Sequence, residues 1–69
     1  MRVIDCLGRP CPVPVIELAK ALPEVAVGEL LEVLSDDPAA AVDIPAWCRM
    51  RNQEWLGQVG RGHRVRRLS

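Results

Sequence analysis

Aromatic residues are scarce in this 69-residue chain, which contains no tyrosine, no phenylalanine and two tryptophans. Proteins that bind single-stranded nucleic acid usually stack the bases on several aromatic side chains. Trp47 and Trp55 alone do not form such a platform. The composition therefore argues against a nucleic-acid-binding protein of this kind.

Long apolar runs are also absent. No stretch approaches the ~20 apolar residues that span a bilayer, and no basic segment precedes an apolar core like that of a secretion signal. We therefore expect a cytoplasmic protein with no membrane partner. An apolar content of 49% is typical of a folded protein. Because a chain this short buries only about 60% of its unfolded surface, we expect a single domain over residues 1–69.

The cysteine count is odd, since the chain contains Cys6, Cys11 and Cys48. Three cysteines cannot all pair within one chain, which favours free thiols in a reducing compartment. A zinc site would need a fourth ligand such as the single histidine, His63. No two of these four residues have the short spacing of a zinc knuckle. We therefore expect no metal and no cofactor.

Charge is distributed unevenly although the formal net charge is zero. Residues 1–45 have a net charge of −5, and residues 46–69 have a net charge of +5. This polarity either helps the protein to dock onto a partner or reflects a solvated sheet edge protected by arginines. It also raises an alternative function, a regulatory or nucleic-acid-binding module whose basic residues would be Arg61, Arg64, Arg66 and Arg67.

Hydrophobic periodicity predicts a strand, a helix and a second strand in the first half of the chain. Met1–Leu7 is the first strand, and Cys6 on its apolar face is either a small buried residue or a resolving thiol. A helical stripe follows at Val15, Leu18, Ala19 and Leu22. Pro23 ends this helix. Glu29–Ser35 is almost continuously apolar, which predicts a central strand of the sheet.

A second helix is predicted over Ala39–Met50. Asp37 is its expected N-cap and Pro38 its first residue; the alternative is that Asp36 and Asp37 form a metal-binding or catalytic pair. Pro45 is expected to kink or restart the helix. Three apolar residues share one helical face and are predicted core residues: Ile44, Trp47 and Cys48.

Two further strands, Gln53–Val59 and His63–Leu68, complete the pattern, with a tight turn between them. The order β-α-β-α-β-β predicts an α+β fold, a two-layer α/β sandwich in which both helices cover one face of a four-stranded mixed sheet. Arg64 and Arg66 lie two residues apart in the last strand, so their side chains should point to the same side, and we expect them on the open face. His63, next to the turn, is expected to face solvent.

The motif Cys11-Pro12-Val13-Pro14 lies where the first strand should meet the first helix. With Cys11 as the N-cap, Pro12 takes the first helical position, where its fixed φ suits a helix. A buried cysteine in a helix-starting turn is the alternative. The rigid segment Gly8-Arg9-Pro10 before the motif and the prolines within it favour a presented, functional thiol.

This helix start also predicts how Cys11 ionises. An α-helix leaves its first four amides without partners, and two of these positions are prolines, so Val13 and Val15 provide the donors. These amides, the helix dipole and Arg9 should bring the pKa of Cys11 below the ~8.5 of a free cysteine. We therefore assign Cys11 as the catalytic residue, positioned by Arg9, Pro12, Val13, Pro14 and Val15.

Three segments, in this order, resemble the TusA-like (SirA-like) sulfur-carrier family: Asp5–Pro14, Gly28–Pro38 and Asp43–Trp47. The resemblance covers nearly the whole chain and implies a TusA-like sulfur-carrier domain over residues 1–69. It also implies a β-α-β-α-β-β fold like that of the C-terminal domain of bacterial translation initiation factor three.

The resemblance implies a sulfur relay in which Cys11 accepts sulfane sulfur as a persulfide and passes it on. Family donors include cysteine desulfurases and rhodanese-type proteins; family acceptors include relays for tRNA thiolation, molybdenum-cofactor enzymes and sulfur-oxidation systems. Such a sulfurtransferase-type carrier is expected to act as a monomer, without direct nucleic-acid contact. Many relatives have several basic residues in the first helix, whereas here Glu17 is present and Lys20 is the only cation.

Overall fold

The order of strands and helices along the chain agrees with the sequence prediction. The computed structural model describes all 69 residues. Its elements are β1 (Arg2–Asp5), α1 (Val13–Ala21), β2 (Leu30–Leu34), α2 (Ala40–Arg51), β3 (Glu54–Val59) and β4 (Gly62–Arg66). A single 3-10 turn, Leu22–Glu24, follows α1 and contains Pro23.

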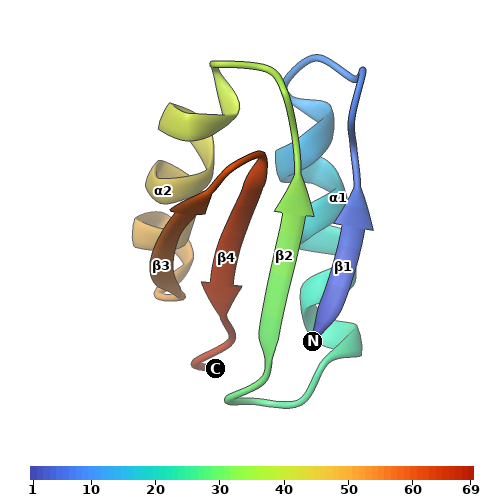
Figure 1. Cartoon of the computed structure of the whole chain (residues 1–69). Helices are drawn as coiled ribbons and strands as arrows, with labels where there is room; N and C mark the ends of the chain where they lie inside the picture. The colour runs from blue at the N-terminus through green and yellow to red at the C-terminus, as the bar shows by residue number, and fades with distance from the viewer.

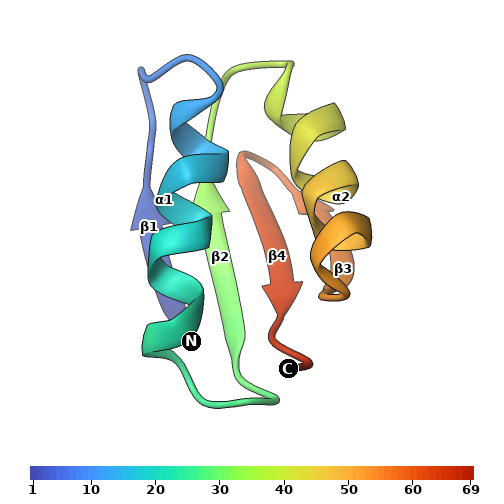
Figure 2. The ribbon, with the colours of Figure 1, turned by 180° about the vertical axis from the view of Figure 1, so that it is seen from behind.

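The four strands form one mixed sheet in the order β1-β2-β4-β3. β1 and β2 are parallel, while β2 pairs antiparallel with β4 and β4 with β3. Both helices lie on the same face of this sheet, and the opposite face is open (Figures 1 and 2). The predicted two-layer α+β sandwich is therefore confirmed, with β2 in the interior of the sheet as its apolar sequence indicates.

One hydrophobic core fills the space between the helices and the sheet. Leu18 of α1 and Leu31 and Val33 of β2 are completely buried there. Each such side chain contributes roughly 1.5–3 kcal/mol when it leaves water. The three residues predicted on one face of α2 are also buried, which confirms that prediction: Ile44, Trp47 and Cys48.

The second helix departs from its predicted form in two ways. It begins at Ala40, after a turn at Pro38 and Ala39, and it runs through Pro45 without a restart. Of the predicted kink or restart at Pro45, the restart is wrong, because Pro45 removes only the amide that would bond to Ala41. Ala41 is exposed, so water can bond to its carbonyl instead. Neither helix is long and apolar enough to span a bilayer.

His63 is buried, with 1% of its surface exposed. The prediction that it faces solvent is wrong. Side chains alternate along β4, so placing Arg64 on the open face requires His63 and Val65 to face the helices. There His63 lies next to Trp55, with their ring centroids 5.9 Å apart. Burial lowers the pKa of His63 below its ordinary value.

Candidate functional site

The loop that contains Cys11 lies at the edge of the sheet where β1 and β2 end. These two strands are parallel, so their carboxyl ends meet at one edge. The loop from β1 to α1 and the loop from β2 to α2 consequently lie side by side (top of Figure 1). Functional sites in α/β proteins often form at this edge, because two loops can combine their side chains there.

Two aspartates after β2 hold the loop that contains Cys11. The backbone amide of Gly8 donates to Oδ1 of Asp36 at 3.1 Å, and the amide of Cys11 donates to Oδ2 of Asp37 at 2.9 Å. The other oxygen of Asp37 accepts the amide of Ala39 at 2.8 Å. These bonds from Ala39 and Cys11 lower the pKa of Asp37. Asp37 thus caps the turn that precedes α2 and also fixes the backbone of Cys11. Its predicted role as N-cap of the helix, with Pro38 as the first helical residue, is wrong, because Ala39 is the N-cap and α2 begins at Ala40.

The first helix begins one residue later than the sequence predicts. Pro12, with φ −94° and ψ 15°, is the N-cap, and Val13 is the first helical residue. Cys11 therefore precedes the cap, and its assignment as N-cap is wrong. The amide of Val13 donates to the carbonyl of Pro10 at 3.1 Å, which forms a turn ahead of the helix.

This helix start leaves fewer free amides than predicted. Val13 is already bonded to Pro10, Pro14 has no N–H, and Ile16 donates to the carbonyl of Pro12 at 3.0 Å. Only the amide of Val15 lacks an acceptor within the first turn. The predicted pair of amide donors is therefore reduced to one.

The pKa of Cys11 is raised above its ordinary value, which contradicts the predicted lowering. Burial is the main cause, and the nearby carboxylates of Asp43 and Asp37 add to it. Both effects favour the neutral thiol. The prediction considered only the helix start and Arg9, whereas Asp43 of α2 and Asp37 of the loop before α2 place negative charge near the sulfur.

The other two cysteines do not contribute an accessible thiol. Cys6 and Cys48 are each 1% exposed. Burial raises the pKa of Cys48 to about 11. Burial also raises the pKa of Cys6, where Arg9 has a smaller opposing effect. Arg9 was expected to lower the pKa of Cys11, and the pKa of Cys11 is raised instead. No three possible ligands, the cysteines and His63 included, form a group that could hold a metal ion.

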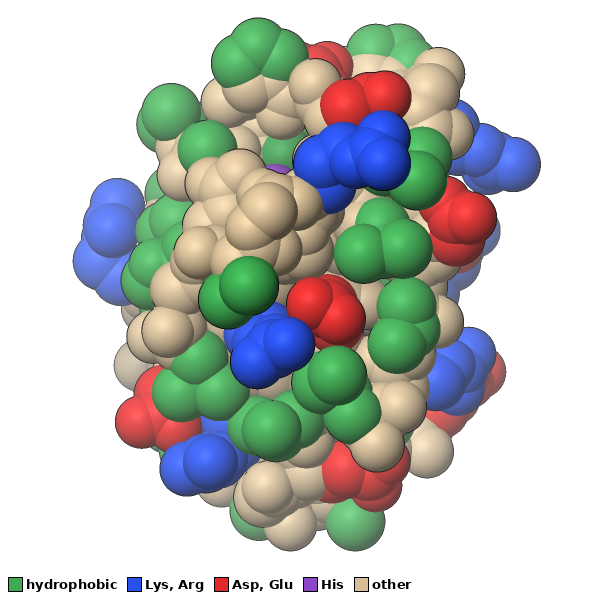
Figure 3. Space-filling model, in the orientation of Figure 1, with side chains coloured by type: hydrophobic (Ala, Val, Ile, Leu, Met, Phe, Trp, Pro, Cys, Tyr) green, Lys and Arg blue, Asp and Glu red, His purple; other side chains and the backbone are tan.

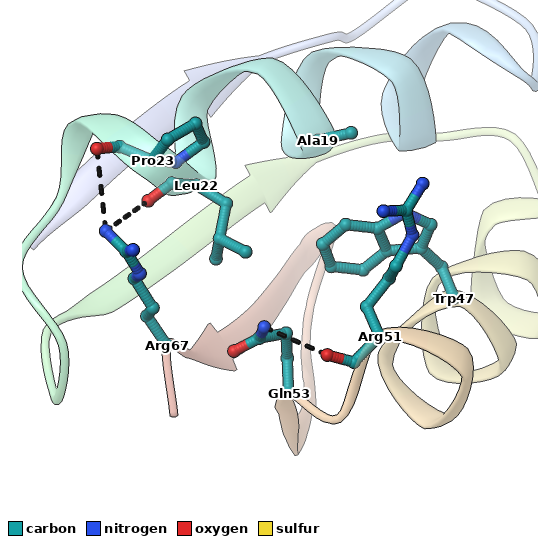
Figure 4. Close-up of a pocket in the computed structure, with 7 residues that line it drawn as sticks. All are labelled: Ala19, Leu22, Pro23, Trp47, Arg51, Gln53 and Arg67. Carbon is teal, nitrogen blue, oxygen red and sulfur yellow. Dashed lines mark hydrogen bonds between the residues drawn. The ribbon is translucent and has the colours of Figure 1, made fainter. Parts of the chain in front are cut away.

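A shallow groove of about 280 Å³ runs beside the Cys11 loop, between the start of α1 and the exposed side of α2. Pro12 and Val15 form one wall, and Asp43 and Trp47 lie on the other. A second hollow of about 270 Å³ lies farther along the helices (Figure 4). Trp47 lines both hollows.

Three of the four C-terminal arginines of the alternative function, Arg64, Arg66 and Arg67, are engaged in contacts within the protein. Arg64 pairs with Glu32 and Arg66 with Glu54, each at 3.3 Å, on the open face of the sheet. Figure 3 shows this face, on which basic and acidic side chains lie among hydrophobic ones. Arg67 donates to the carbonyl of Val25 at 2.6 Å. These pairs do not support the alternative function of a nucleic-acid-binding module.

Comparison with known proteins agrees with this geometry. The family model described as sulfurtransferase TusA matches residues 2–66. The chain belongs to the TusA family. Two Archaeoglobus fulgidus proteins, named as sulfur carrier proteins, are 48% and 46% identical over 54 residues. These residues make up 78% of this chain and 70% and 74% of the relatives.

A solved structure confirms the fold of this TusA family member. The SirA-like protein from Desulfitobacterium hafniense superimposes with a TM-score of 0.72 at 31% identity. The match covers 94% of this chain and 92% of that one. The predicted family and fold are therefore both correct.

Two residues of the site were missed from the sequence. Asp37 was assigned to helix capping or to a pair with Asp36, and not to the Cys11 loop, although a residue directly after β2 should lie near the loop after the parallel strand β1. That signal was present in the predicted topology. Asp43 had no such signal, because its contact with Cys11 depends on how α2 packs against α1.

Proposed function

We propose that Cys11 carries sulfane sulfur as a persulfide between a donor protein and an acceptor protein. Membership in the TusA family supports a sulfur-relay role, and the A. fulgidus relatives bear the name of sulfur carriers. One observation supports Cys11 as the carrier. It lies half-buried in an edge loop, while Cys6 and Cys48 are buried in the core.

The proposed transfer conserves atoms and electrons. The thiolate of Cys11 attacks the outer sulfur of a persulfide on the donor, and a new S–S bond forms as the bond to the donor cysteine breaks. The donor cysteine leaves as a thiolate and takes up the proton that Cys11 loses. The outer sulfur keeps its oxidation level, so the exchange needs no external oxidant or reductant. Attack by the acceptor thiolate repeats the exchange in the next step.

The residues around Cys11 position its sulfur rather than form a substrate pocket. Asp37 holds the backbone amide of Cys11, and Pro12 and Pro14 restrict the chain that follows. Val15 provides the unpaired amide and one wall of the groove. A sulfur presented at a loop edge, beside an open groove, suits exchange with another protein more than binding of a small substrate.

The raised pKa of Cys11 has a consequence for this mechanism. The nucleophile in the exchange is the thiolate, yet the isolated protein favours the neutral thiol at neutral pH. A neutral thiol resists unproductive oxidation between transfers. Ionisation of Cys11 must then be promoted when the donor is bound.

Substitution of the carrier thiol tests this function directly. We expect Cys11→Ser to abolish sulfur acceptance from a cysteine desulfurase supplied with cysteine, with an unchanged fold because serine keeps the amide that bonds to Asp37. Intact-mass analysis would detect one added sulfur atom in the wild type and none in the variant. The matched control is Cys6→Ala, which should still accept sulfur. Equal labelling of Cys11→Ser and the wild type would refute the assignment.

A further inference from the structure

The groove beside Cys11 combines apolar walls with a single charged residue. Pro12, Val15, Ala46, Trp47 and Met50 line it together with the carboxylate of Asp43. Met50 is 75% exposed, so its side chain is available to a partner. An open apolar groove with one charge is suited to a short segment that has matching apolar and charged side chains.

Asp43 differs from the other two aspartates near Cys11 because its carboxylate accepts no backbone amide and forms no ion pair. Asp36 accepts the amide of Gly8, and Asp37 accepts two backbone amides. The four ion pairs of the protein do not include Asp43. Its carboxylate, which is exposed at the groove, is therefore free to receive a cation from another molecule.

The groups that act on the thiol of Cys11 are all of one sign or neutral. Asp43 and Asp37 face it from the side of α2, and Cys6 faces it from the end of β1. No cationic group of the chain contributes to its ionisation equilibrium. The groove is lined by no basic side chain, so a cation from another molecule can pair with Asp43 there.

We propose that this groove docks a segment of the sulfur donor in which a basic side chain, flanked by apolar ones, pairs with Asp43. The proposal rests on the sulfur-carrier function proposed above and names the chemistry of the partner. Pairing offsets the negative charge of Asp43 next to Cys11. The pKa of Cys11 then falls when the donor is docked, so the nucleophile forms where it is needed.

Three short peptides with an activated disulfide test the proposal on the full-length protein. One places arginine between two leucines, the second arginine between two glycines, and the third glutamate between two leucines. Cys11 displaces the activating thiol of each peptide and forms a mixed disulfide, whose formation rate is measured by mass spectrometry at low ionic strength. We expect the arginine–leucine peptide to react about two- to fivefold faster than the glutamate peptide, the range of an exposed ion pair.

Two groove variants separate the contributions of charge and apolar contact. Asp43→Asn should abolish the rate ratio between the arginine and glutamate peptides. A change in thiolate fraction cancels in this ratio, because it affects both peptides equally. Met50→Gln should reduce the advantage of leucine over glycine while preserving the preference for arginine. The matched control is Asp36→Asn, which removes the same charge from the adjacent loop but lies outside the groove.

The outcomes distinguish this proposal from the proposed function. An arginine preference that survives Asp43→Asn, or falls equally in Asp36→Asn, would overturn the pairing with Asp43. An unchanged leucine advantage in Met50→Gln would overturn the apolar part of the docking site. The peptides contain no sulfane sulfur, so these results do not depend on persulfide formation. Failure of the desulfurase labelling alone would refute the sulfur-carrier function and leave the groove as a docking site for basic peptides.

Discussion

Replacement of His63 by leucine should make the protein less sensitive to mild acid. The imidazole is 1% exposed and packs next to Trp55 under the helices. Its Nδ1 atom has no hydrogen-bond partner, and burial lowers its pKa. At low pH the unfolded chain binds a proton on this histidine that the folded protein excludes. This proton binding favours the unfolded chain and lowers the stability of the fold.

The sign and size of the effect follow from this linkage. An unfolded histidine has a pKa of about 6.5, and the folded value is lower. The free energy of unfolding should therefore be constant above about pH 6.5 and fall as the pH decreases toward the folded pKa, by at most ~1.4 kcal/mol per pH unit. For a domain of this size, each kcal/mol corresponds to about 4–8 °C in melting temperature.

Thermal unfolding of the wild type and His63→Leu between pH 7.5 and pH 5 measures this effect. The difference between the two melting temperatures isolates His63, since all other titrating groups are the same in both proteins. We expect leucine to gain stability relative to the wild type as the pH falls. The chain has one histidine, so NMR can follow its titration without ambiguity. Parallel melting curves, or an imidazole with an ordinary pKa, would refute the reasoning.

Two other substitutions test the core and the loop. Cys48→Ala should lower the free energy of urea unfolding by about 1 kcal/mol through lost packing. Alkylation and sulfur transfer at Cys11 should be unchanged in this variant. Lost transfer in a variant of unchanged stability would make Cys48 a relay thiol. Asp37→Ala should lower the urea midpoint at pH 6 and speed hydrogen exchange at the Cys11 amide. The folded pKa of Asp37 lies below its ordinary value of 3.8, so the stability difference between Asp37→Ala and the wild type should shrink as the pH falls below 3.8. An equal loss of stability in Asp36→Ala would contradict a specific role of Asp37.

The sequence by itself determined the features that depend on local periodicity. Ile44, Trp47 and Cys48 recur at helical spacing, so they share a face whatever that face packs against. Arg64 and Arg66 are two residues apart in a strand and must point the same way. Because side chains alternate along a strand, the same pattern places His63, the neighbour of Arg64, on the buried side, although its position next to a turn suggested exposure.

Only the tertiary structure decided how Cys11 ionises. Its amide is held by Asp37, 26 residues away in the sequence, and its thiol faces Asp43 because α2 packs against α1. Coulomb interactions depend on the distance between charges and on the medium between them, and neither quantity is encoded in a local pattern. The motif therefore predicted where the proposed carrier sulfur lies, while the packing of the two helices decided in which direction its pKa is shifted.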